Sequence, residues 1–144
     1  MTKKEEISEL YHDKLNCAQS VFSVYVKEMG VDENTARAIA TGFGAGIARS
    51  QQICGALTGA IMVLGVKFFN PENLYDSKEF IYYKTTELME RFKNIHGSCN
   101  CKDLIGVDFN TDEGIEFAEK NDLFNIKCKK YLNDVCTILD ELIE

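Results

Sequence analysis

Six cysteines are the residues of this chain that could do chemistry, and they are spread over nearly all of its 144 residues. Disulfides are rare in reducing compartments, where cysteines more often bind metal or exchange electrons. Only Cys99 and Cys101 are close in sequence. No Cys-x-x-Cys motif signals a thioredoxin-type dithiol, and no Cys-x-x-Cys-His motif signals covalent haem. The spacing permits a four-thiolate site assembled by the fold without requiring one. The other four cysteines are Cys17, Cys54, Cys128 and Cys136.

Cys54 stands between a glycine-rich segment and an apolar segment within residues 41–65. Glycine in a helix costs roughly 1 kcal/mol relative to alanine, so a compensating close contact is expected. Gly55 and Gly59 share one helix face, where the missing Cβ lets a ligand or another backbone approach. Two interpretations are open. One is a cofactor-binding groove that involves Gly44, Gly55 and Gly59 and has a thiol at its rim; the other is tight helix packing around a buried cysteine.

The position of Cys54 relative to the helix start decides its expected reactivity. Glycines at alternate positions in residues 42–46 predict a bend or an irregular loop. A fresh helix that begins near Ser50 would place Cys54 in its first turn, where the positive end of the helix dipole would stabilise a thiolate. A continuous helix over residues 33–65 would exclude this hypothesis.

The chain has few helix breakers and no long alternating runs, which predicts an all-α fold. Pro71 is the only proline. We expect one compact, bundle-like domain of five or six helices that spans residues 1–144. Asp76 is expected to cap the longest helix, with Glu79 completing a capping box and Gly97 ending the helix. Helices are also expected over residues 5–11, over 15–30, and over 33–41 with Asp32 as its cap. Three more are expected: one that starts near residue 50, a short one capped by Thr111, and one from 124 or 128 to 142.

Charge and composition exclude several function classes. The net charge is −7 and no Lys/Arg stripe is present, so binding to nucleic acid or to an anionic membrane surface is not expected. The first ten residues lack the apolar core of a signal peptide, which predicts a cytoplasmic protein. The longest uncharged apolar run, residues 53–66, is shorter than the roughly 20 residues of a membrane helix. No motif indicates a nucleotide or haem cofactor. His12 and His96 could ligate metal, but lone histidines near helix ends are expected to be surface residues or caps.

Four segments carry a resemblance to a known family. They are Asn-Cys17-Ala-Gln-Ser-Val; Phe43-Gly-Ala-Gly46 with Cys54-Gly-Ala-Leu-Thr-Gly59-Ala; Cys101-Lys-Asp-Leu; and Cys128-Lys-Lys-Tyr-Leu. In this order they resemble the motifs of the C_GCAxxG_C_C family of redox-active proteins. The resemblance extends from about Leu15 to the C-terminus, and its central Cys-Gly-Ala-x-x-Gly element is the specific part.

The resemblance implies a helical domain with a redox role. The family is similar to the non-haem part of split-Soret cytochromes, whose fold is associated with a cysteine-ligated iron–sulfur cluster. By this resemblance the expected ligands are Cys17, Cys54, Cys101 and Cys128. Cys99 and Cys136 are additional to the pattern, and Cys99 could replace Cys101 or pair with another thiol.

Three functions are open at this point. The first is electron transfer through a cluster to a redox partner that the sequence does not identify. The second is thiol–disulfide exchange with Cys54 as the attacking thiolate. The third is a non-redox binding module with a glycine-lined groove. A homodimer is compatible with each of them.

Overall fold

The computed structural model describes residues 1–144 and is all-α, as the sequence predicts. Nine segments carry α labels; α4 turns in the left-handed sense, which leaves eight right-handed α-helices. This exceeds the expected five or six, because short helices such as α7 are too brief to show an amphipathic pattern. The elements are α1 (Lys3–Asp13), α2 (Cys17–Lys27), α3 (Glu33–Ala40), η1 (Thr41–Phe43), α4 (Gly44–Ile47), α5 (Gly55–Phe68), α6 (Leu74–His96), α7 (Cys101–Ile105), α8 (Asp112–Lys120) and α9 (Leu123–Leu142).

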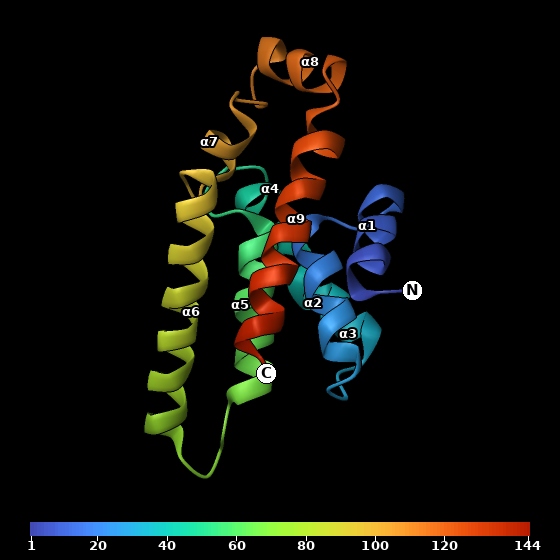
Figure 1. Cartoon of the computed structure of the whole chain (residues 1–144). Coiled ribbons are helices and arrows are strands. Elements are labelled where there is room, and N and C mark those ends of the chain that lie inside the picture. Colours follow the sequence, from blue (N-terminus) through green and yellow to red (C-terminus); the bar gives the residue numbers. More distant parts are fainter.

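Helices α2 and α5 pack against each other at the centre of the molecule, with α3, α6 and α9 around them (Figure 1). The residues of α5 itself are apolar on nearly every face, which is typical of a buried helix. Its Leu57, Val63 and Leu64 side chains are fully buried, as are Val21 and Tyr25 of α2. No helix is both long and apolar enough to cross a bilayer.

Two glycines of α5 lie directly against α2. A Cβ on Gly59 would come within 2.9 Å of the carbonyl oxygen of Ala18, and a Cβ on Gly55 within 2.2 Å of Cys17 Sγ. Both glycines are therefore packed against α2. This supports the helix-packing interpretation at Gly59, while Gly55 also borders the cysteine cavity described below.

Several predicted helix ends are confirmed. Asp32 caps α3 and Thr111 caps α8, each accepting a hydrogen bond from a backbone N–H three residues later. Gly97 ends α6 with a φ of 84°, a left-handed conformation that glycine adopts without steric cost.

The predicted cap of α6 at Asp76 is wrong. The helix begins at Leu74, and the side chain of Asn73 accepts from the backbone N–H of Asp76. Asn73 also donates from Nδ2 to the Asp76 carboxylate at 2.9 Å. Asparagine and aspartate are comparable N-caps, so residue type alone did not separate the two positions.

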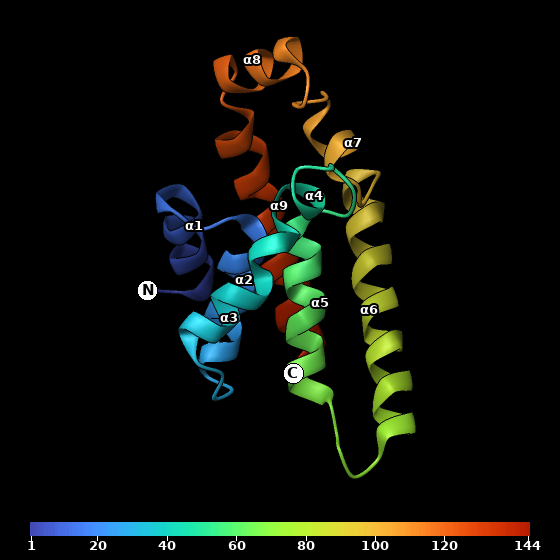
Figure 2. The same cartoon turned by 180° about the vertical axis from the view of Figure 1, so that it is seen from behind.

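The buried apolar residues form two clusters. The larger is built mainly from α2, α5, α6 and α9. Figure 2 shows α7, α8 and the first turns of α9 as an arch beyond this body, and the arch holds the smaller cluster. Residues of both clusters line the cavity described next. The smaller cluster is formed by Cys101, Ile105, Phe109, Ala118 and Leu123.

Candidate redox site

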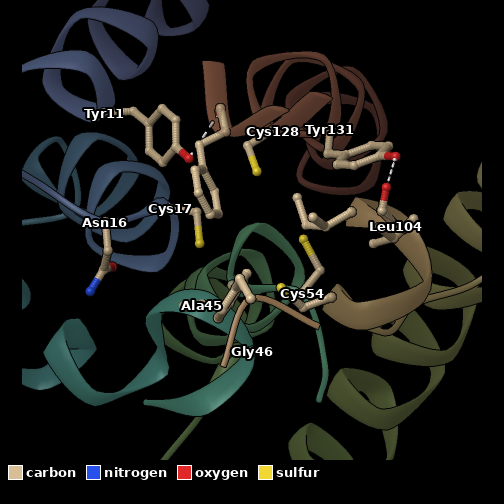
Figure 3. A pocket seen from close by; sticks show the side chains of 14 residues that line it. Tyr11, Asn16, Cys17, Ala45, Gly46, Cys54, Leu104, Cys128 and Tyr131 are labelled. Atoms are coloured by element: carbon tan, nitrogen blue, oxygen red, sulfur yellow. Dashed lines mark hydrogen bonds between the residues drawn. The ribbon is translucent and has the colours of Figure 1, made fainter. Parts of the chain in front are cut away.

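Four cysteines from four separate segments line one cavity of about 120 Å³. Figure 3 shows the sulfur atoms of Cys17, Cys54 and Cys128 directed towards the same space, and Cys101 also lines it. Most of the wall is hydrophobic. The lining residues are Tyr11, Asn16, Cys17, Ala45, Gly46, Cys54, Gly55, Cys101, Leu104, Ile105, Phe109, Phe124, Cys128 and Tyr131.

Cys17 is the first residue of α2, as expected for a cysteine in the first turn. Its position is fixed by Asn16, whose side chain accepts from the N–H of Gln19 while the Gln19 side chain accepts from the N–H of Asn16. Asn16 also donates from Nδ2 to the carbonyl oxygen of Thr41 at 2.9 Å. This reciprocal capping box ties the helix start to the glycine-rich segment. Glycine at position 55 then leaves room for Cys17 Sγ against α5.

Cys54 and Cys101 are brought together by an isolated antiparallel bridge between Ile53 and Asn100. The N–H of Cys54 donates to the carbonyl oxygen of Cys99 at 2.8 Å, and the N–H of Cys101 donates to that of Gln52 at 2.6 Å. The sequence predicts Cys54 in the first turn of its helix, but it is the N-cap of α5 and lies one residue before that turn. The predicted break before this helix is confirmed, and residues 33–65 do not form a continuous helix.

The break contains an unusual left-handed turn over residues 45–49, all with φ between 49° and 69°. Left-handed helical conformation costs roughly 1–2 kcal/mol for each non-glycine residue, and four of the five residues are not glycine. The turn is held by hydrogen bonds from the N–H of Gln51 to Ala45 and from the N–H of Gln52 to Gly46. At Gly46 a Cβ would lie 2.6 Å from the Gln51 backbone, so this position requires glycine.

The left-handed turn contributes to the wall of the cavity at Cys17. Ala45 and Gly46 both line the cavity. Burial raises the pKa of the Cys17 thiol, while backbone N–H groups of Ala45, Ala18 and Gly55 lower it. These N–H groups favour negative charge on the sulfur, and strained backbone of this kind tends to occur at functional sites.

Burial also raises the pKa of Cys54 well above its ordinary value, with a further contribution from Cys17. The N–H groups of Ala56 and Leu57 at the start of α5 act in the opposite direction but are outweighed. The start of α5 therefore favours the Cys54 thiolate, as expected, but burial opposes this effect and is the larger of the two. Removal from water disfavours the charged sulfur more than the helix end favours it.

The other two cavity thiols behave in the same way. Burial, with a smaller contribution from neighbouring thiols, raises the pKa of Cys101 to about 12 and that of Cys128 to about 11. Burial is thus the main reason why the four thiols resist ionisation. A bound metal centre would supply positive charge in place of the four thiol protons and so offset the cost of ionising the buried sulfurs.

Two tyrosines that the sequence analysis missed also line the cavity. The Tyr11 hydroxyl donates to the carbonyl oxygen of Phe124 at 3.1 Å, and the Tyr131 hydroxyl donates to that of Leu104 at 2.6 Å (Figure 3). Tyr131 thereby joins α7, which carries Cys101, to α9. A weak signal existed: Tyr131 follows Cys128 by three residues, which places both on one helix face.

The remaining candidate residues lie outside the cavity. Gly44 packs against the side chain of Asn16 and Gly59 against α2. Cys99 is half-buried near the Met89 carbonyl oxygen, and Cys136 is fully buried in the main core, deeper than the margin predicted for it. None of these lines the space shared by the four cysteines.

His96, at the end of α6, is more buried than predicted. It was expected to be exposed, but its side chain is only 7 % exposed and its Nε2 lies 2.9 Å from an Asp134 carboxylate oxygen. The rings of Phe92 and Tyr131 pack on it. His12 is exposed as predicted. No three His, Cys, Asp or Glu side chains in the structure converge tightly enough to hold a single metal ion.

Comparison with known proteins supplies the family. Residues 15–142 match the family described as "Putative redox-active protein (C_GCAxxG_C_C)". The chain belongs to this family. A relative from Archaeoglobus fulgidus, described as "Uncharacterized protein", is 31% identical over 112 residues, which cover 70% of this chain and 72% of the relative. No solved structure matches the chain.

The C_GCAxxG_C_C match confirms the family expected from the four motifs and gives the chain a family described as redox-active. All four cavity cysteines fall within the matched residues. Tyr11, which lines the cavity from α1, precedes them. The C_GCAxxG_C_C region thus supplies every thiol of the cavity, and α1 adds part of the wall.

Proposed function

We propose that the chain transfers electrons through an iron–sulfur cluster held by Cys17, Cys54, Cys101 and Cys128. One observation carries this proposal: four thiols from distant segments line a single, mainly apolar cavity. An all-cysteine cluster takes four thiolates, which is the donor set present here. When bound, such a cluster would accept and release single electrons.

A single ion and a cluster place different demands on the four thiols. Four thiolates around one zinc ion, each with a bond of about 2.3 Å, would have sulfur atoms about 3.8 Å apart. No three candidate ligands of this protein converge tightly enough to hold one ion. A cluster distributes its four thiolates over several metal atoms, so the proposal requires a wider set of sulfurs than a single ion does.

The protein's own residues have three tasks in this proposal. The N–H groups of Ala45 and of the first turn of α5 favour charge on Cys17 and Cys54. The apolar walls exclude water, and both effects tune a reduction potential. The bridge between Ile53 and Asn100 holds two of the ligand segments at a fixed separation.

The test is iron and acid-labile sulfide per chain in protein purified without oxygen or chelator. We expect matching amounts of both and a visible absorption band. Serine at any one of the four cavity cysteines should lower metal affinity more than about tenfold, since even changes outside the ligand set cost 10–100-fold. Cys136→Ser and Cys99→Ser are the matched controls and should keep the iron.

Two results would overturn the cluster proposal. One is absence of iron after anaerobic reconstitution. The other is a loss of iron in Cys136→Ser as large as in the cavity variants, which would point to instability rather than ligation. If iron were lost in Cys99→Ser but retained in Cys101→Ser, Cys99 would replace Cys101 as the fourth ligand, and the other three ligands would stay as proposed.

Thiol–disulfide exchange is the second candidate, because the same cavity brings four thiols near one another. Two of them would form a disulfide and pass two electrons and two protons to an acceptor disulfide, which becomes a dithiol. The raised pKa of Cys54 makes its thiolate scarce at neutral pH. Rapid alkylation of Cys54 in the folded chain, with loss of two hydrogens on mild oxidation, would favour this candidate over the cluster.

A further inference from the structure

A second depression lies between α1 and α9 and is separate from the cysteine cavity. It has a volume of about 280 Å³, and five of its eight lining residues are polar, while Ile7, Leu132 and Cys136 supply an apolar part of the wall. Lys4 and Ser8 line it from α1, and Lys129, Lys130 and Asn133 line it from α9. The two helices run side by side in both views of the fold (Figures 1 and 2). We call this depression the lysine groove.

The lysine groove is positively charged although the chain carries net charge −7. Lys129 and Lys130 make no ion pair, and Lys4 donates only to the hydroxyl of Thr137, at 2.6 Å. No carboxylate lines the groove. Most lysines of the chain likewise make no ion pair, so the groove differs only in gathering three of them around one depression.

The three carboxylates of α9 interact with residues outside the groove. Asp134 pairs with His96 and Glu141 with Arg91. Asp140 accepts from the Tyr25 hydroxyl at 2.6 Å. On α1, Glu6 pairs with Lys27, while Glu5 and Glu9 are exposed and do not line the groove. These carboxylates keep their charge but are directed to partners outside the groove, so none of them is paired with its three lysines.

The groove adjoins the cysteine cavity along both helices. Lys129 directly follows Cys128, and Ser8 lies one helical turn before Tyr11. Cys128 and Tyr11 both line the cavity. One helical turn rises about 5.4 Å, so a partner seated in the groove would lie within a few ångströms of the cavity wall.

We propose that the lysine groove docks a carboxylate-rich surface of an acidic redox partner protein beside the cysteine centre; the partner's role rests on the proposed electron transfer. No arginine lines the groove, and bidentate recognition of a phosphate group relies mainly on arginine. Three ammonium groups on two helices suit several separate carboxylates. Such complementary charge speeds association and selects the partner.

The test uses the full chain as purified and fluorescein-labelled hexaglutamate as an acidic probe, followed by fluorescence anisotropy. The groove variant is Lys4→Gln/Lys129→Gln/Lys130→Gln. The matched control is Lys67→Gln/Lys93→Gln/Lys120→Gln, which removes the same charge from exposed lysines elsewhere. We expect Kd to rise about tenfold in the groove variant and to change little in the control. Binding should weaken as ionic strength rises from about 0.01 to about 0.15 M.

Equal weakening in the two triple variants would overturn the proposal, because net charge alone would then explain binding. Inorganic phosphate that binds in the groove without any response to hexaglutamate would also overturn it and indicate a small-anion site. Binding by labelled hexaglutamine at similar strength would exclude charge recognition. None of these binding measurements requires iron. A negative binding result would therefore refute the docking proposal without affecting the cluster proposal, and absence of iron would refute the cluster without affecting binding in the groove.

Discussion

Three glycines of α5 offer a test that separates folding from the function of the cavity. Gly55, Gly59 and Gly65 each become alanine by the addition of one methyl group, but the surroundings of that methyl differ. At Gly65 it meets nothing within 4 Å. At Gly59 it would lie 2.9 Å from a backbone oxygen of α2, and at Gly55 it would lie 2.2 Å from Cys17 Sγ.

The expected magnitudes follow from these contacts. Gly65→Ala should stabilise the protein by about 0.5–1 kcal/mol, because alanine favours the helix and nothing opposes the methyl group. Gly59→Ala gains the same propensity but forces two packed backbones apart, at a cost of about 1–3 kcal/mol, so its free energy of unfolding should fall.

Gly55→Ala differs because the nearest opposing atom ends a side chain that can rotate, although the backbone atoms Phe43 O and Ala18 N, at 3.1 and 3.2 Å, must also give by a few tenths of an ångström. Cys17 Sγ must move at least about 1.2 Å to reach an ordinary contact of 3.4 Å. Stability should therefore fall less than in Gly59→Ala, whereas iron affinity should fall more than tenfold, since metal sites tolerate little displacement of a ligand.

The assay is thermal unfolding together with iron content for all three variants. Stability should rank Gly65→Ala above wild type and Gly59→Ala below it, with roughly 2–4 °C of Tm per kcal/mol for a chain of this length. Iron should be lost only in Gly55→Ala. A Gly55→Ala protein with full iron would refute the placement of Cys17 Sγ against α5, and iron losses that simply follow Tm would refute the separation of the two effects.

Two further predictions concern tyrosine and pH. Tyr131→Phe removes the donor to the Leu104 carbonyl oxygen and should cost about 1 kcal/mol, with faster amide exchange in α7; Tyr83→Phe, an exposed site without a hydrogen bond, should change neither quantity. Burial raises the pKa of Cys136 from 9.0 to about 11, so the folded state holds this proton more tightly than the unfolded state. Stability from this group is complete below pH 9 and falls as pH rises through 11, by about 2 kcal/mol at that point. Cys136→Ala should flatten this part of the curve of unfolding free energy against pH, and an unchanged slope would contradict the assignment.

Much of the fold could be predicted because its determinants are local. The caps at Asp32 and Thr111 and the helix end at Gly97 depend on residues within one turn of each boundary. The same logic misplaced the start of α6, because Asn73 and Asp76 are comparable caps three residues apart. Local rules rank such positions poorly when two good caps fall within one turn.

The cavity was beyond local rules because its parts meet through tertiary structure. The bridge between Ile53 and Asn100 joins segments far apart in sequence and has no hairpin signal. The left-handed turn at residues 45–49 uses alanine, isoleucine and arginine, which disfavour that conformation, so only the alternate glycines of residues 42–46 suggested a break. The buried state of Cys54 and His96 likewise depends on neighbours from other helices. The family resemblance, rather than spacing, selected the four cysteines that the structure brings to one cavity.

The distribution of the cavity lining along the chain sets an order of assembly. The wall begins at Tyr11 and ends at Tyr131, so a nascent chain that still lacks α9 has three of the four thiols and no closed cavity. At roughly 5–20 residues per second, Cys128 is synthesised about 6–22 s after Cys17. Until then the early thiols lack their apolar enclosure and are open to oxidation or to stray metal. The newly made chain therefore needs protection during this interval, either from a reducing environment or from early docking of α1 and α2. Once α9 has closed the cavity, the fold itself encloses these thiols.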